Sequence, residues 1–97
     1  MTGCGAPTSV TGVDVSTQSV ICGVVRRAGE AVDGAYVRLL DASGEFAAEV
    51  PTGETGEFRF FAAPGTWTVR TLVAGADPVD RAVVAQHGAV AEVDVSV

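Results

Sequence analysis

Residues 21–70 decide the fold, and they read ICGVVRRAGEAVDGAYVRLLDASGEFAAEVPTGETGEFRFFAAPGTWTVR. Apolar residues recur at every second position in short runs, and glycine-containing turns separate the runs. Val37 and Leu39 in one run and Phe58 and Phe60 in another show this alternation. A period of two is typical of strands that bury one face. The expected fold is therefore an all-β, seven-stranded antiparallel Greek-key β-sandwich.

Turn residues divide the chain at intervals of about ten residues, as in many sandwiches and barrels. The expected strands cover residues 19–27, 35–41, 45–51, 57–62, 66–74, 80–86 and 90–97. Asp41 and Gly44 suit the ends of a type I turn, because the aspartate side chain can bond its own backbone. Residues 1–17 are rich in Gly, Thr and Ser and predict a flexible N-terminal arm. Residues 18–97 then form one β-sandwich domain.

Alternation also assigns each strand residue to a face. The inward set is Ile21, Gly23, Val25, Ala35, Val37, Leu39, Phe58, Phe60, Trp67, Val69, Val93 and Val95. The outward set is Cys22, Val24, Arg26, Tyr36, Arg38, Leu40, Arg59, Phe61, Arg70 and Leu72. Four arginines thus alternate with apolar side chains on surfaces that usually carry Thr, Ser and Glu.

Composition excludes several classes of function. The 97 residues are 47% hydrophobic and carry a net charge of −6, which argues against binding to nucleic acid or to an anionic membrane. No stretch approaches the ~20 apolar residues of a membrane span, and the N-terminus lacks the pattern of a secretory signal. A cytoplasmic location is expected, with Cys4 and Cys22 reduced and no disulfide between them.

Two family resemblances rest on quoted motifs. Ile-x-Gly-x-Val at residues 21–25, Gly-x-Phe-x-Phe at 56–60 and Pro-Gly-x-Trp at 64–67 resemble the carboxypeptidase regulatory-like family of prealbumin-like sandwiches. The segments GAYVRLLD (34–41), EFAAEV (45–50) and FRFFAAPG (58–65) resemble a small actinobacterial family of unknown function. Its genes commonly lie beside a thiosulfate sulfurtransferase gene, and its members have a cysteine near the N-terminus. The resemblance implies a link to sulfur metabolism by genomic association.

Enzymes with related folds can be tested by counting residues. Hydroxyisourate hydrolases need several histidines, and intradiol dioxygenases need two Tyr and two His to hold iron. This chain has only Tyr36 and His87. Adhesin domains stapled by isopeptide bonds need a lysine, which is absent here. His87 is interpreted as a surface residue and Glu45, Glu49, Glu54 and Glu57 as solvated acids, so no catalytic residue, metal or cofactor is expected.

Cys4 is the candidate reactive group, because a thiol between two glycines is accessible to a partner and a thiolate can attack a sulfane sulfur. The alternative is an incidental cysteine. Cys22 is interpreted as a small packing residue.

A possible interaction surface joins arginines to aromatic residues, on the condition that their strands are adjacent. Its members are Tyr36, Arg38, Arg59, Phe61 and Arg70. Arginines and aromatics are enriched at interface hot spots. Cross-strand pairing with acids such as Glu49 and Asp94, or a sheet face covered by the N-terminal arm, are the alternatives.

The leading functional hypothesis is a non-enzymatic binding module that contacts a partner protein, with a sulfurtransferase as the partner that the resemblance implies. A homo-oligomer is also possible. The alternative is a sulfur carrier that uses the Cys4 thiol. Carbohydrate binding is a weaker alternative, because Trp67 is expected to be buried.

Overall fold

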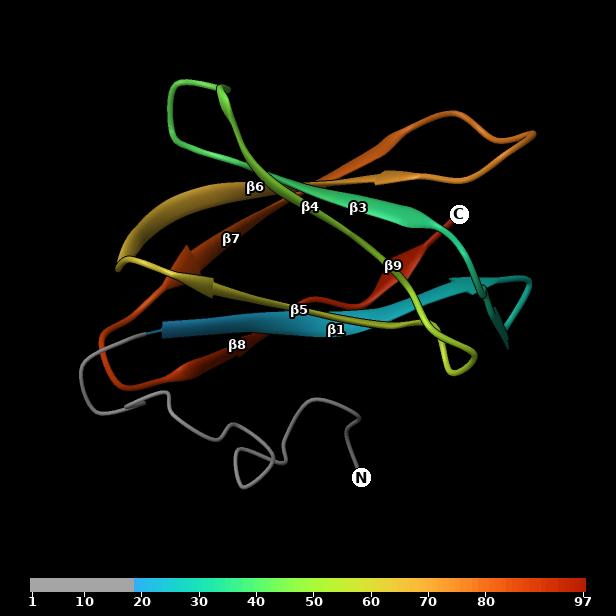
Figure 1. Ribbon diagram of the computed structural model, residues 1–97, viewed down its shortest axis with the longest axis horizontal. Coiled ribbons are helices and arrows are strands. Elements are labelled where there is room, and N and C mark those ends of the chain that lie inside the picture. Colours follow the sequence, from blue (N-terminus) through green and yellow to red (C-terminus); the bar gives the residue numbers. More distant parts are fainter. Residues whose placement is uncertain (1–18) are drawn as a thin grey trace.

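The computed structural model describes residues 19–97, which form two β-sheets with an apolar interior between them (Figure 1). No helix occurs in this range, so none could cross a membrane there. The strands are β1 (Ser19–Arg27), β2 (Glu30–Ala31), β3 (Tyr36–Leu40), β4 (Phe46–Pro51), β5 (Glu57–Ala62), β6 (Gly65–Leu72), β7 (Val79–Ala85), β8 (Val90–Glu92) and β9 (Val95–Ser96).

One sheet, here called the β1 sheet, is built around its longest strand. β5 and β2 pair antiparallel with β1 along one edge, and β8 and β9 pair parallel with the other edge. The second sheet, here called the β3 sheet, has the strand order β4-β3-β6-β7 and is antiparallel throughout. A β-bulge between Leu39 and Leu40 shifts the register of β3 against β4.

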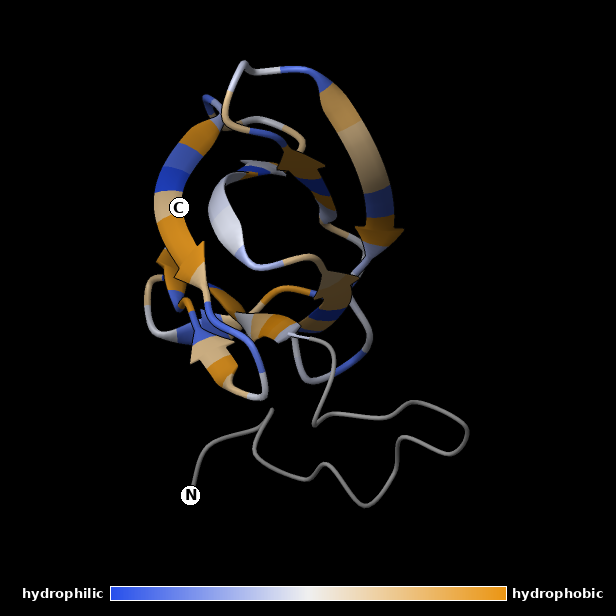
Figure 2. Ribbon diagram, turned by 90° about the vertical axis from the view of Figure 1, so that its left-hand side faces the viewer, coloured by the Kyte–Doolittle hydropathy of each residue, from blue (hydrophilic) through white to orange (hydrophobic). Residues whose placement is uncertain are grey.

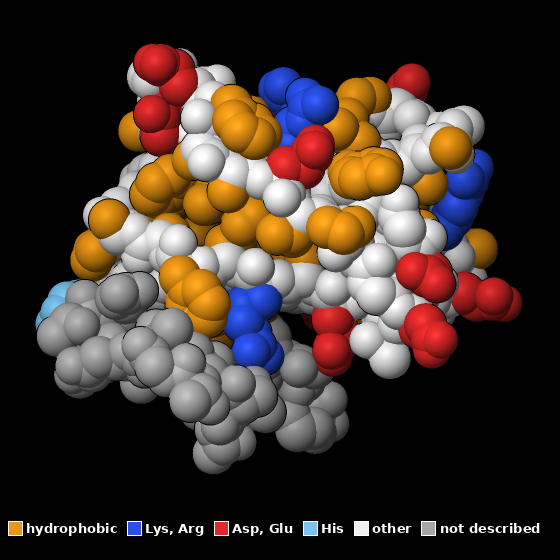
Figure 3. Space-filling model, viewed as in Figure 1, with side chains coloured by type: hydrophobic (Ala, Val, Ile, Leu, Met, Phe, Trp, Pro, Cys, Tyr) orange, Lys and Arg blue, Asp and Glu red, His pale blue; other side chains and the backbone are white. Residues whose placement is uncertain are grey.

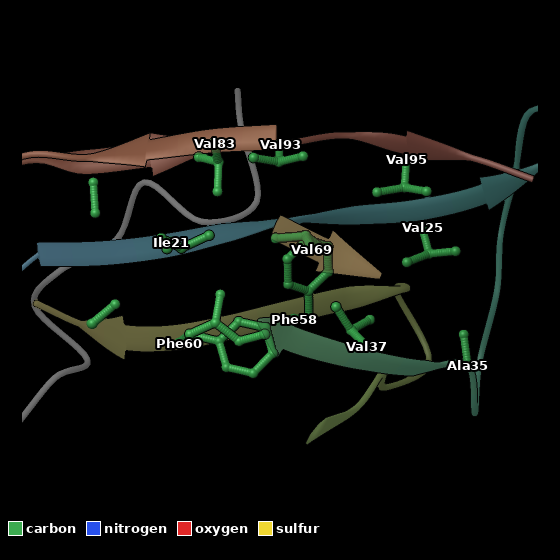
Figure 4. Close-up of a cluster of buried hydrophobic side chains, with 13 residues drawn as sticks. Ile21, Val25, Ala35, Val37, Phe58, Phe60, Val69, Val83, Val93 and Val95 are labelled. Carbon is green, nitrogen blue, oxygen red and sulfur yellow. The ribbon is translucent and has the colours of Figure 1, made fainter. Parts of the chain in front are cut away.

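The interior is apolar because each strand contributes alternate residues to it, and Figure 4 shows these side chains between the two sheets. Ile21, Val25 and Val37 are fully buried. Phe58 and Phe60 are buried on β5, and their ring centroids lie 6.1 Å apart. Hydrophobic and hydrophilic residues alternate along the strands that surround this interior (Figure 2). The inward set expected from the sequence therefore forms the core, and Trp67, which is half-buried, packs against it.

Two glycines allow β1 to approach its neighbours closely. A Cβ at Gly23 would overlap the carbonyl oxygen of Val93 and lie 2.9 Å from Cζ of Phe58. A Cβ at Gly56 would lie 2.6 Å from the carbonyl oxygen of Val25, and the φ angle of Gly56 is 75°. These contacts explain why both glycines appear in the Ile-x-Gly-x-Val and Gly-x-Phe-x-Phe motifs.

Thr52 closes the loop between β2 and β3. Its hydroxyl donates to the carbonyl oxygen of Val32 at 2.7 Å and accepts from the backbone N–H of Ala35 at 2.9 Å. Its backbone N–H donates to the carbonyl oxygen of Ala35 at 2.8 Å. The side chain is 4% exposed, so these bonds satisfy polar groups that are largely out of reach of water.

The sandwich predicted from the sequence is confirmed, with four differences in detail. Strands 19–27 and 57–62 have the expected bounds, and the middle strands differ by one or two residues. The last expected strand, 90–97, is split into β8 and β9, and the short β2 was not expected. The sheets are not purely antiparallel, because β8 and β9 run parallel to β1. The chain reaches them by crossing from β7 in the other sheet, and that crossing sets their direction.

Candidate functional site

A row of four charged side chains crosses the outer face of the β3 sheet. The strand register aligns Glu49 with Arg38, Arg38 with Arg70, and Arg70 with Asp80. Two arginines thus lie opposite each other on the central strands, and one acid flanks each of them. We call these four residues the charged row.

Each arginine in the charged row is paired with its own acid. Arg38 Nε donates to Glu49 Oε2 at 2.6 Å. Arg70 donates to both oxygens of Asp80, at 2.8 Å from Nε and 3.0 Å from the second nitrogen. Like charges directly opposite on neighbouring strands repel. Each guanidinium bonds the acid on the strand away from the other arginine, and these two ion pairs offset the repulsion.

The Arg70–Asp80 pair shifts both protonation equilibria. The hydrogen bond from Arg70, assisted by its charge, lowers the pKa of Asp80, while slight burial opposes the shift. The same hydrogen bond and charge raise the pKa of Arg70. Both groups are therefore charged at neutral pH, and the outer face presents fixed charges rather than a group poised for proton transfer.

Apolar side chains lie on both sides of the charged row. Pro51, Tyr36 and Leu72 align on one side, and Phe46, Leu40 and Ala82 align on the other, where the polar Thr68 lies between Leu40 and Ala82. Tyr36 is 53% exposed and Phe46 is 62% exposed. Val84, further along β7, is 57% exposed. Figure 3 shows hydrophobic side chains on both sides of basic and acidic groups in the region where Figure 1 places β3 and β4.

The structure separates the five residues that the sequence grouped into one surface. Tyr36, Arg38 and Arg70 share the outer face of the β3 sheet. Arg59 and Phe61 lie on β5 in the β1 sheet, where they pair with Cys22 and Val20. The condition that all their strands are adjacent is therefore not met. Two ion pairs match the alternative of cross-strand pairing: Arg38 with Glu49, and Arg26 with Asp94 at 4.0 Å. The sequence analysis did not identify Asp80 as the partner of Arg70.

Cys22 differs from the expectation of a reduced thiol. Its sulfur is disulfide-bonded, and the residue is fully buried. The expectation was therefore wrong for Cys22. Cys4, the other cysteine of the sequence and the candidate reactive thiol, lies outside the described residues, as does the predicted arm 1–17.

Nothing in residues 19–97 assembles a metal site, since no group of three or more His, Cys, Asp or Glu side chains converges there. Trp67 donates its indole N–H to the carbonyl oxygen of Ala63 at 2.9 Å and packs against the core. A stacking platform for a sugar needs an exposed ring face, so this geometry does not favour carbohydrate binding.

A family model described as a protein of unknown function, DUF1416, matches residues 4–97. The chain belongs to this family. An uncharacterised protein of Mycolicibacterium smegmatis is 56% identical over 88 residues, which cover 89% of this chain and 96% of that protein. An uncharacterised protein of Mycobacterium tuberculosis is 54% identical over 87 residues, covering 88% of this chain and 85% of that protein. The resemblance to an actinobacterial family of unknown function is thereby confirmed.

Solved structures with low sequence identity share the fold of this DUF1416 protein. The major pilin subunit BcpA of Bacillus cereus matches with a TM-score of 0.65 and 13% identity, covering 82% of this chain and 29% of the pilin. A dioxygenase domain from Streptomyces sp. SirexAA-E matches with a TM-score of 0.64 and 10% identity, covering 91% and 84%. The neighbours thus include both an enzyme and a structural protein. Their likeness establishes the β-sandwich alone.

Proposed function

We propose that this DUF1416 protein is a non-enzymatic binding module whose contact surface is the outer face of the β3 sheet. The observation that carries the proposal is the exposure of Tyr36, Phe46 and Val84 around the charged row. Large apolar side chains gathered on one face are a feature of interaction surfaces. Aromatic and arginine side chains are also the residues most enriched among interface hot spots.

The charged row gives this surface a means of selecting its partner. Arg38 and Arg70 are already paired in the free protein, and their side chains are 44% and 40% exposed. A partner that brings acidic groups opposite the two arginines and apolar groups opposite Tyr36 and Phe46 matches the face in both respects. Because each ion pair is half-exposed, the charges contribute specificity and orientation more than affinity.

The partner that we propose is a thiosulfate sulfurtransferase in the cytoplasm. This part of the proposal rests on the family resemblance and its genomic association. The apolar surface and the charged row support protein binding, whichever partner is involved. A homo-oligomer formed through the same face is the competing outcome.

Calorimetry and size-exclusion chromatography test both parts of the proposal. The purified chain is titrated with the thiosulfate sulfurtransferase of the same organism. The double variant Tyr36→Ser/Phe46→Ser is expected to bind at least ~10-fold more weakly. Phe61→Ser is the matched control, since Phe61 is a 45% exposed aromatic on the other sheet and should leave binding unchanged.

Each part of the proposal has its own contrary result. If the unaltered chain shows no binding to the sulfurtransferase, the proposed partner is wrong. If it binds and the double variant binds equally well, the proposed surface is wrong. If the unaltered chain forms a concentration-dependent dimer that the double variant abolishes and Phe61→Ser preserves, the surface binds a second copy of the chain.

A further inference from the structure

The two edge strands of the β3 sheet differ in how they end its ladder of hydrogen bonds. On β4 the register against β3 jumps from Ala48 to Phe46, which leaves Ala47 as the extra residue of the bulge. The strand also ends at Pro51, which has no N–H to donate. Bulges and prolines on an edge strand hinder pairing with another strand. The edge at β4 is therefore protected by its own backbone.

β7, at the other edge of this sheet, has neither device. Its register against β6 is regular from Val79 to Ala85, and the strand contains no proline. Residues 82–85 are Ala-Val-Val-Ala, a run of four apolar residues in which Val84 is 57% exposed. Within residues 19–97, no strand pairs with the side of β7 that faces away from β6. A regular, apolar edge of this kind is a template for pairing with another chain.

Arg81 interrupts the inward row of β7. It lies opposite Val69 in the register, and Val69 points into the core (Figure 4). Val83 and Ala85, further along the same row, are buried in that core, whereas Arg81 is exposed at the edge of the sheet. Its guanidinium makes no hydrogen bond or ion pair with the part of the chain that the structure describes, whereas both arginines of the charged row are paired. An inward-pointing charge is one of the devices that keep edge strands from pairing.

We propose that Arg81 prevents β7 from pairing with the β7 strand of a second copy of this chain. When two such strands pair antiparallel about a two-fold axis perpendicular to the sheet, the inner faces of both copies lie on the same side. Directly opposite residues share a face, so Arg81 opposes an inward residue of the second copy. The inward residues are Val79, Arg81, Val83 and Ala85. None of them is an acid, so every register that includes Arg81 sets the guanidinium against apolar side chains or against its own charge.

The same alternation predicts how the strand behaves once the charge is removed. In Arg81→Val the apolar run extends over residues 81–85. With the two-fold axis at Val83, this run pairs with itself from end to end, and position 81 lies opposite Ala85 of the second copy. β-branched side chains stabilise cross-strand pairs of this kind. The inference concerns the edge of the β3 sheet and is independent of the outer face that we propose as the contact surface.

Sedimentation velocity of the full chain over a range of concentrations tests the proposal. Arg81→Val is expected to dimerise with a dissociation constant at least ~10-fold lower than that of the unaltered chain. Arg81→Lys keeps the charge and should associate as the unaltered chain does. Arg27→Val is the matched control, because Arg27 is an exposed arginine on β1, and it should also leave association unchanged. Hydrogen exchange of residues 79–85 should slow in the Arg81→Val dimer, whereas that of residues 36–40 should not.

Three results would overturn the proposal. If Arg81→Val associates no more strongly than the unaltered chain, the charge does not protect the edge. If Arg27→Val associates as strongly as Arg81→Val, loss of any exposed arginine is sufficient and the position has no special role. If the dimer forms without slower exchange at residues 79–85, another surface forms it. Arg81→Thr also removes the charge and keeps a β-branched side chain, so it takes the same three tests if circular dichroism shows Arg81→Val to be unfolded.

Discussion

The close approach of β1 to the chain before β9 makes Gly23 the most demanding position in the sandwich. Gly23→Ala adds a Cβ that would overlap the carbonyl oxygen of Val93 and lie 2.6 Å from its carbonyl carbon. Both of these are backbone atoms, so no side-chain rotation relieves the overlap. The segment at Val93, between β8 and β9, must move away, and the 2.8 Å hydrogen bond from the Val93 N–H to the carbonyl oxygen of Cys22 is then lost.

The expected cost follows from these contacts. Overpacking a well-packed site costs about 1–3 kcal/mol, and loss of a backbone hydrogen bond costs about 0.5–1.5 kcal/mol. We expect Gly23→Ala to lower the free energy of unfolding by about 2–4 kcal/mol. For a domain of this size, that corresponds to a fall in Tm of roughly 10–30 °C.

Chemical denaturation followed by circular dichroism measures this change. Gly53→Ala is the matched control, because no atom lies within 4 Å of a Cβ there. This control should be neutral or slightly stabilising, since alanine reduces the conformational freedom of the unfolded chain. If the free energies of unfolding of Gly23→Ala and Gly53→Ala differ by less than about 0.5 kcal/mol, close backbone approach does not explain the Ile-x-Gly-x-Val motif.

Three further predictions concern polar groups. Thr52→Val should destabilise the fold by about 1–3 kcal/mol in urea denaturation, because Val32 and Ala35 lose their buried hydrogen-bond partner, and Thr52→Ser should recover most of the loss. Thr71 is fully buried and its hydroxyl has no hydrogen-bond partner. Thr71→Val should therefore be neutral or stabilise the fold by ~1 kcal/mol, and a clear destabilisation would show that this hydroxyl has a partner. Hydrogen bonds from its own turn, led by the one from the Ser43 hydroxyl, lower the pKa of Asp41. The ionised carboxylate therefore stabilises the turn at pH values above the pKa of the unfolded chain, and this contribution is lost as the pH falls through the lower pKa of the folded state. An NMR titration midpoint at or above the usual value of 3.8 would contradict this.

Local periodicity was enough to predict which residues enter the core. Val37 and Leu39 on β3, and Phe58 and Phe60 on β5, are buried as their alternation predicts. A one-residue shift of the period would place these side chains in water, so the pattern within each strand determines its inward face. The turn at Asp41 was predictable for the same reason, because its hydrogen bonds connect residues at most four positions apart.

The candidate surface was harder to predict, because it depends on which strands are neighbours. Arg38 and Arg59 look equivalent in sequence, since each alternates outward between apolar residues. One lies on the β3 sheet and the other on the β1 sheet, and only pairing between distant segments decides this. The Arg70–Asp80 pair likewise depends on the register of β6 against β7. No local pattern contains that register.

Cys22 shows how a residue with an ordinary local pattern acquires an unexpected environment. Its place in the alternation directs it away from the main core, and the sequence led us to expect a reduced, small packing residue there. Its complete burial and its disulfide are not encoded in the alternation of the strand itself. The two outer faces of the sandwich therefore differ in kind. The β3 sheet presents the exposed side chains of Tyr36 and Phe46 beside paired charges, whereas the central strand of the β1 sheet keeps its outward residues buried and the exposed apolar side chains of that sheet, Phe61 and Val90, lie on the neighbouring strands.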